Sequence, residues 1–74
     1  MKTLNIYKGF VIPTEDGFRE ITGRHFDDFA ADNYVTDDEG NETMTGSVIL
    51  KASEIKTAMH EATGQAYDFV QYDE

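Results

Sequence analysis

The sequence predicts a small α+β fold in which a small antiparallel β-sheet carries two short helices packed on one face. Two patterns lead to this prediction: apolar residues alternate with polar residues in some segments, and they recur at helical spacing in two others. Clusters of turn-forming residues separate these segments. The chain has 74 residues and no linker-like stretch, so we expect one domain, 1–74, with a thin core.

Residues 3–22 are predicted to form a β-hairpin. The apolar residues of its first half recur with a period of two, as expected for a strand with one buried face; they are Leu4, Ile6, Phe10 and Ile12. Turn-forming residues follow at 13–17, and the alternation resumes from Phe18 to Thr22.

Residues 23–34 are predicted to form the first helix, because apolar and acidic residues would then lie on opposite sides of it. The apolar side holds Phe26, Phe29 and Ala30, and the acidic side holds Asp27, Asp28 and Asp32. A turn at 37–41 is expected to join two strands, 33–36 and 43–50, into a second hairpin.

The second helix is predicted to begin at Ser53, a favourable N-cap residue, and to end at Gly64. An apolar stripe on this helix should face the sheet; it consists of Ile55, Ala58, Met59 and Ala62. Residues 66–72 are rich in aromatic side chains and are expected to form a closing strand.

The strongest feature of the composition is its acidity. The chain carries 15 Asp and Glu residues against 6 Lys and Arg residues, a formal net charge of −9. This charge disfavours direct binding to nucleic acid, because the phosphates would be repelled, and it favours a protein partner with a basic, nucleic-acid-binding surface. Residues 25–50 hold seven of the acids and no Lys or Arg.

The candidate partner-binding residues are therefore the acids of this middle stretch and one tyrosine. The acids are Asp27, Asp28, Asp32, Asp37, Asp38, Glu39 and Glu42. Tyr34 lies among them, and tyrosine is enriched at binding hot spots because it combines apolar area with a polar tip.

The composition also bears on location. The chain has no cysteine, which favours a reducing compartment, and its longest apolar run is Val48-Ile49-Leu50. The first residues lack the apolar core of a signal peptide. We therefore expect a cytoplasmic protein without membrane contact.

Two groups of residues have side chains of the kinds that bind metal ions. His25, Asp27 and Asp28 offer an imidazole and two carboxylates, but this set is small and a solvated helix start is the simpler interpretation. The stretch 37–42 is similar to a calcium loop, yet with Gly40 as the loop glycine the ligand positions fall on Val35 and Gly46. We predict no metal, no cofactor and no catalytic residues, and hence no enzyme.

The opening segment 2–12, together with Asp16-Gly17-Phe18, resembles the initial hairpin of many small phage and prophage proteins. With its small size, its lack of cysteine and its acidic middle stretch, the chain is similar in style to phage-encoded inhibitors of bacterial defence, such as anti-CRISPR proteins that imitate DNA. The resemblance implies an inhibitor that works in the host cytoplasm by blocking a nucleic-acid-binding defence complex.

A second hypothesis explains the acidity differently. The chain would be a structural or assembly module, with two copies joined as a homodimer through a sheet edge, and its acids would serve solubility.

Overall fold

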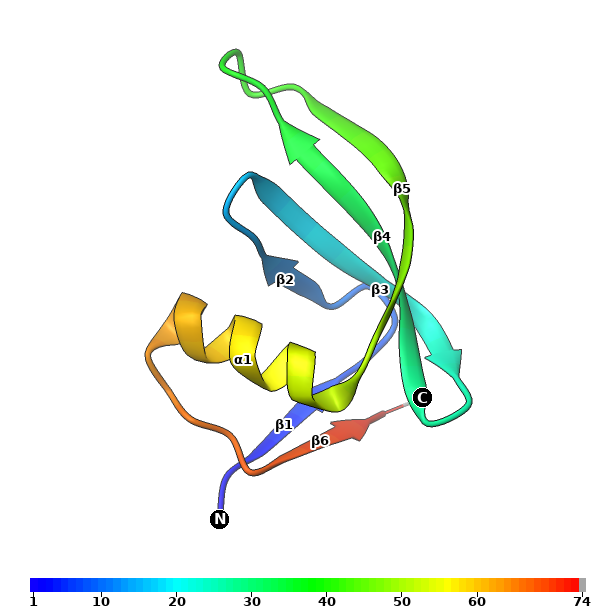
Figure 1. The fold of residues 1–74 in the computed structure, drawn as a ribbon, viewed down its shortest axis with the longest axis vertical. Helices are drawn as coiled ribbons and strands as arrows, with labels where there is room; N and C mark the ends of the chain where they lie inside the picture. The colour runs from blue at the N-terminus through cyan, green and yellow to red at the C-terminus, as the bar shows by residue number, and fades with distance from the viewer. Residues whose placement is uncertain (74) are drawn as a thin grey trace.

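The computed structural model describes residues 1–73 and has an α+β fold, as predicted. In the described chain, a four-stranded antiparallel sheet is combined with a two-stranded parallel pair and one helix (Figure 1). The elements are, in chain order, β1 (Thr3–Ile6), β2 (Val11–Pro13), β3 (Gly17–His25), β4 (Asp28–Thr36), β5 (Glu42–Leu50), α1 (Ala52–Thr63) and β6 (Phe69–Tyr72). The prediction of two helices is therefore wrong.

The four-stranded sheet has the order β2-β3-β4-β5, with each strand antiparallel to its neighbour. The β4–β5 hairpin extends beyond the rest of the molecule at the top of Figure 1. The molecule is accordingly elongated and thin, with extents of 40 × 27 × 16 Å.

The predicted helix at 23–34 is instead a tight hairpin that joins β3 to β4. Phe26 and Asp27 form its turn, and Phe26 has a left-handed backbone with φ 55°. Phe29 and Ala31 are both buried, so the core-facing residues of β4 recur with a period of two. Pairing with β3 on one side and β5 on the other supplies the backbone hydrogen bonds that a helix would have made internally.

The predicted hairpin at 3–22 is correct only in its second half, where β2 pairs with β3 around residues 14–16. A turn interrupts the first half: the Phe10 N–H donates to the Tyr7 carbonyl at 2.9 Å, and Gly9 has φ 94°. The chain before this turn, β1, pairs with the closing strand β6 in parallel, from Thr3 opposite Phe69 to Ile6 opposite Tyr72.

The helix α1 confirms the second predicted helix with small corrections. It is capped at Lys51 rather than Ser53, and the Glu54 carboxylate accepts the Lys51 N–H at 3.3 Å, which is half of a capping box because lysine has no acceptor. Gly64 ends the helix in the left-handed conformation. Within the predicted stripe Ile55 and Met59 are buried, Ala58 is half-buried, and Ala62 is exposed.

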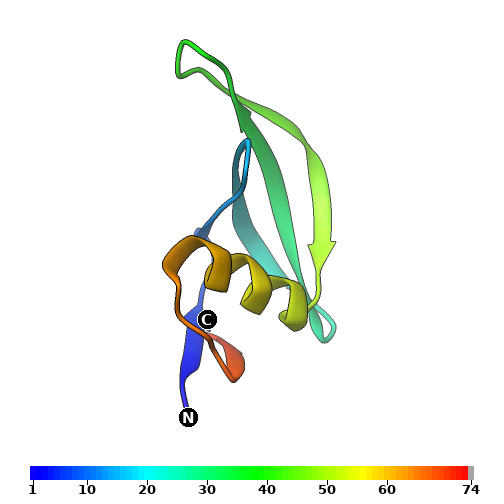
Figure 2. The ribbon, with the colours of Figure 1, turned by 60° about the vertical axis from the view of Figure 1, so that its left-hand side comes forward.

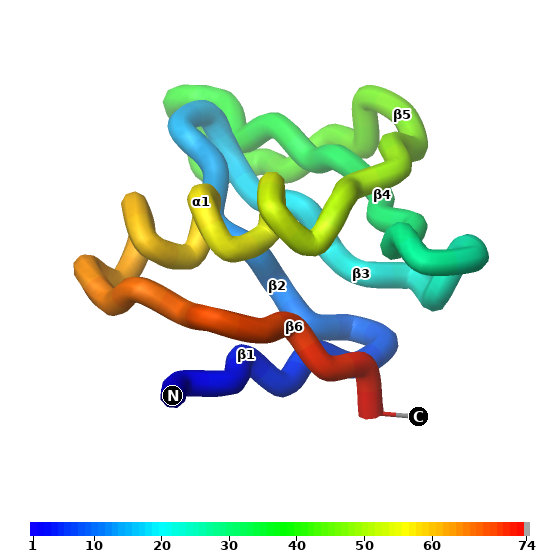
Figure 3. The backbone as a smooth tube through the Cα atoms, turned by 60° about the horizontal axis from the view of Figure 1, so that its bottom comes forward, coloured from blue at the N-terminus to red at the C-terminus, as the bar shows by residue number. Residues whose placement is uncertain are grey.

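The core lies on one face of the four-stranded sheet, beneath α1 and the β1–β6 pair (Figures 2 and 3). Its buried residues are Leu4, Ile6, Ile12, Ile21, Phe29, Ala31, Leu50, Ile55 and Met59. All of these are apolar, and no described polar or charged residue is buried. In the part of the chain that the structure describes, no helix is long and apolar enough to cross a membrane.

Candidate partner-binding surface

The second face of the four-stranded sheet carries no covering element, and we call it the outer face. Residues directly opposite each other in an antiparallel sheet point to the same side, so the strand register sorts the side chains into two faces. The outer face consists of Val11, Pro13, Phe18, Glu20, Gly23, His25, Asp28, Ala30, Asp32, Tyr34, Thr36, Glu42, Met44, Ser47 and Ile49.

The outer face includes no Lys or Arg. Two arginines occur in β3, but Arg19 lies opposite the buried Ile12 and Arg24 lies opposite the buried Phe29, so both belong to the inner face. The sheet therefore separates the cations of β3 from the acids of β3 and β4. This separation leaves the outer face with carboxylates that no neighbouring cation on that face neutralises.

Two carboxylates meet directly at the middle of the outer face. Glu20 of β3 lies opposite Asp32 of β4, and both are half-buried. Ser47 of β5 donates its hydroxyl to Asp32 Oδ1 at 2.9 Å. Like charges directly opposite each other destabilise a sheet, so this arrangement opposes folding while it concentrates negative charge.

An apolar row lies next to this acidic pair. Phe18 and Tyr34 stack with their ring centroids 4.7 Å apart and their planes 11° from parallel. Met44 is opposite Tyr34 on β5 and is 55% exposed. The outer face therefore offers both charge and accessible apolar area to a partner.

The tip of the β4–β5 hairpin forms a second acidic region, which consists of Asp37, Asp38, Glu39 and Glu42. The Asp37 carboxylate accepts the backbone N–H groups of Asn41 at 2.8 Å and Glu39 at 2.9 Å. The bond from Asn41, and secondarily the one from Glu39, lowers the pKa of Asp37 below its ordinary value. Asp37 thus shapes the turn, and all four carboxylates of the tip are exposed.

The predicted binding residues are spread over the whole sheet. Asp27 and Asp28 lie at the β3–β4 turn, and Asp32 and Tyr34 lie along β4. Asp37, Asp38 and Glu39 lie beyond the other end of β4, and Glu42 begins β5 opposite Thr36. The predicted grouping of Asp27, Asp28 and Asp32 on one side of a helix is wrong, because only Asp28 and Asp32 share the outer face.

Sequence reasoning missed Glu20 as a candidate. Its role depends on the register that places it opposite Asp32, and no local signal announces that pairing. The turn at 13–17 was predicted, but its acids Glu15 and Asp16 were not among the candidates; in the structure the Asp16 carbonyl accepts the Thr36 N–H at 3.1 Å. This bond brings Glu15 and Asp16 to the end of β4, next to the hairpin that bears the tip acids.

Two of the three residues considered, and not favoured, as metal ligands are brought together. His25 and Asp28 lie opposite each other across the β3–β4 turn, and the His25 ring packs edge-on against Phe26 with a centroid distance of 4.9 Å. Within residues 1–73, no three His, Asp or Glu side chains converge in a way that could hold a metal ion.

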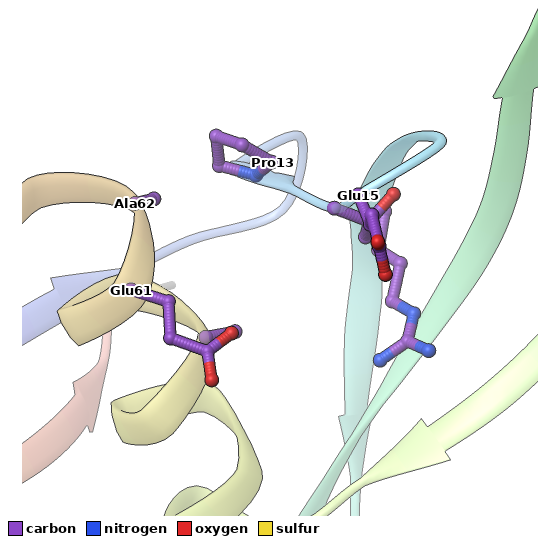
Figure 4. A pocket seen from close by; sticks show the side chains of 7 residues that line it. Pro13, Glu15, Glu61 and Ala62 are labelled. Atoms are coloured by element: carbon purple, nitrogen blue, oxygen red, sulfur yellow. The ribbon is translucent and has the colours of Figure 1, made fainter.

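A groove of about 430 Å³ lies between α1 and the β2–β3 turn (Figure 4). It is lined by Pro13, Thr14, Glu15, Arg19, Ala58, Glu61 and Ala62. The Thr14 hydroxyl accepts the Gly17 N–H at 3.0 Å, and the Arg19 Nε donates to Asn33 at 3.3 Å. Both of these polar groups therefore help to hold the turn and the sheet.

Comparison of the chain with known protein families, curated proteins and solved structures found no match. The functional argument therefore depends on the geometry of the outer face and the hairpin tip.

Proposed function

We propose that the protein is a non-enzymatic binding protein whose outer face engages a basic, nucleic-acid-binding surface on another protein and so excludes the nucleic acid. The observation that carries the proposal is the pairing of Glu20 with Asp32 on a sheet face without cations. This pairing opposes folding, and a cationic partner would turn the repulsion into attraction.

The geometry suits imitation of a nucleic-acid backbone. A strand rises about 3.3 Å per residue, so Asp28 and Asp32 lie roughly 13 Å apart along one face of β4. Their carboxylates offer acceptors that Lys and Arg side chains bind in place of phosphates. The net charge of −9 would speed the encounter with a positively charged groove.

The apolar row would supply contact area that charged side chains alone do not provide. Tyr34 is half-buried in its stack with Phe18, so its ring is held in place before a partner arrives. Aromatic side chains of this kind dominate many interfaces, whereas exposed charges contribute more to rate and specificity. We assign Tyr34 and Met44 as the apolar contacts that flank the acidic pair.

The setting that we propose is inhibition of a bacterial nucleic-acid-binding defence complex by a phage-type protein in the host cytoplasm. It is supported by the acidity of the chain and by the absence of Lys and Arg from the outer face. The target would be the cationic groove that such a complex uses to hold DNA or RNA.

The test begins with a pull-down from bacterial lysate, followed by binding measurements with the purified partner. The variant Glu20→Lys/Asp32→Lys should lose binding by at least about tenfold, since attraction becomes repulsion. Glu61→Lys/Asp73→Lys, at exposed positions outside the sheet, makes the same change in net charge and should bind almost as the parent does.

Two further results bear on the proposal. DNA or RNA should compete with the protein for the partner, and binding should weaken as salt is raised. If both double variants lost partner binding equally, the effect would come from net charge alone and the outer face would not be the binding surface. A partner that binds nucleic acid and this protein at the same time would also overturn the proposal.

A further inference from the structure

The free edge of β5 is the longest unguarded strand edge in the described chain. β5 has nine residues and ends the order β2-β3-β4-β5, so it pairs only with β4. No backbone hydrogen bond within residues 1–73 reaches its other side. A row of unpaired N–H and C=O groups of this kind is a ready template for another strand.

The other edges carry the protection that β5 lacks. β2 has three residues and ends at Pro13, which cannot donate to a ladder. β1 and β6 have four residues each, so each offers only a short edge. In contrast, the stretch 43–50 has neither a charged residue nor a proline.

One protective feature is present on β5. The register with β4 shifts at Thr45, which is the additional residue of a β-bulge next to Gly46. The bulge leaves Ser47–Leu50 as the regular part of the edge, where Ile49 is 48% exposed and Val48 is half-buried.

We propose that β5 pairs with β5 of a second copy, antiparallel about a twofold axis. Antiparallel pairing of a strand with itself is self-complementary, so a second copy fits this edge without any further feature. Elsewhere, two chains of charge −9 repel each other, and the uncharged stretch 43–50 is where they can approach closely. The pairing would place the exposed Ile49 side chains of the two copies near each other.

The expected dimer is of moderate affinity. Pairing through one strand edge buries less area than the roughly 1,200 Å² of a stable complex, so the association should depend on concentration in the micromolar range or above. The twofold axis of such an antiparallel pair is perpendicular to the sheet. The outer faces of the two copies would therefore lie on the same side of the joined sheet. The inference concerns the backbone edge of β5, whereas the proposed function concerns side chains at the middle of the outer face, so either can fail without the other.

Sedimentation equilibrium over a range of concentrations, at low and high salt, tests the pairing. Dimers should form and should become tighter as salt rises, because salt screens the repulsion between the two chains. Partner binding by the outer face has the opposite salt dependence, which separates the two proposals. A chain that stays monomeric at millimolar concentration and high salt would overturn the inference.

A matched pair of variants locates the interface. Ile49→Lys places a charge on the β5 edge and should weaken the dimer by at least about tenfold. Val11→Lys is the control, because Val11 has a similar exposure of 49% and the same outer face but lies on β2 at the opposite edge. Equal effects of the two substitutions, or no effect of Ile49→Lys, would show that β5 is not the interface.

Hydrogen exchange provides a readout that does not depend on a substitution. The amides of Ser47–Leu50 that face away from β4 should become protected as the protein concentration rises, while those of β2 stay unchanged. Concentration-independent exchange along β5 in samples that contain dimer would also contradict the proposal.

Discussion

Glu20 and Asp32 show how one residue pair can work against the fold. They are directly opposite on neighbouring strands, and the hydroxyl of Ser47 is the one side-chain donor that reaches Asp32 among the described residues. Opposed like charges cost a sheet a few tenths to about 1 kcal/mol. Solubility alone does not require two carboxylates to be adjacent. The position of Glu20 and Asp32, rather than the number of acids, is therefore the observation that supports the proposed binding role.

We therefore expect Glu20→Gln to raise the free energy of unfolding by about 0.5 kcal/mol, because it removes the repulsion and keeps the shape of the side chain. Urea denaturation at low salt would measure the change. The matched variant Glu61→Gln, on the exposed surface of α1, should have almost no effect. If Glu20→Gln lowered stability, the two carboxylates would have to be stabilised by a contact that the strand register does not show.

The elements differ in how far local sequence predicts them. The helix α1 could be predicted because its periodic apolar residues, its first-turn Glu54 and its C-terminal Gly64 all act within a few residues of each other. The β3–β4 hairpin could not, because Phe26 and Asp27 are not the glycine or asparagine that marks a tight turn, and residues 23–34 also fit helical spacing. Its strand form comes from pairing on both sides, which is a tertiary effect.

Long-range pairing also explains the remaining differences between prediction and structure. β1 pairs with β6 across almost the whole chain, and no short-range signal in either strand reports this. For the candidate surface, composition was enough to select the acids of residues 25–50. It could not show that Glu20 lies opposite Asp32, or that Asp27 belongs to a turn while Asp28 and Asp32 share the outer face, since both depend on how the strands pair.

The β3–β4 turn itself can be tested by substitution. Phe26 has φ 55° and is 86% exposed, so its side chain contributes little burial while its backbone pays a steric cost. Phe26→Gly should raise stability by about 1 kcal/mol, since glycine adopts this conformation freely. Asp27→Gly in the same turn should lower stability. Asp27 does not have a positive φ, so glycine removes no strain there and only makes the unfolded chain more flexible. Destabilisation by both substitutions, measured by thermal unfolding, would contradict the turn geometry.

At the scale of the whole molecule, the acids form two regions, the hairpin tip and the middle of the outer face, which differ in solvent exposure. The molecule is elongated, with a longest extent of 40 Å. The hairpin tip lies beyond the end of β4, whereas Asp32 lies near the middle of β4, opposite Glu20. The tip acids Asp38 and Glu39 are exposed, whereas Glu20 and Asp32 are half-buried beside the Phe18–Tyr34 stack. In the proposed binding mode the partner desolvates the middle of the sheet, and the tip stays in water.

This difference predicts separate effects on the kinetics of partner binding. Reversal of the tip, Asp38→Lys/Glu39→Lys, should mainly slow association, because solvent-exposed rim charges act through long-range steering. Reversal at the centre, Glu20→Lys/Asp32→Lys, makes the same change in net charge but should mainly speed dissociation, since it removes charges that are desolvated in the complex. Surface plasmon resonance at two salt concentrations would measure both rates, and the effect of the tip variant should fade at high salt while that of the central variant persists. If the tip variant changed the dissociation rate and the central variant did not, the contact would be centred on the hairpin tip, and the assignment of the outer face as the binding surface would be wrong.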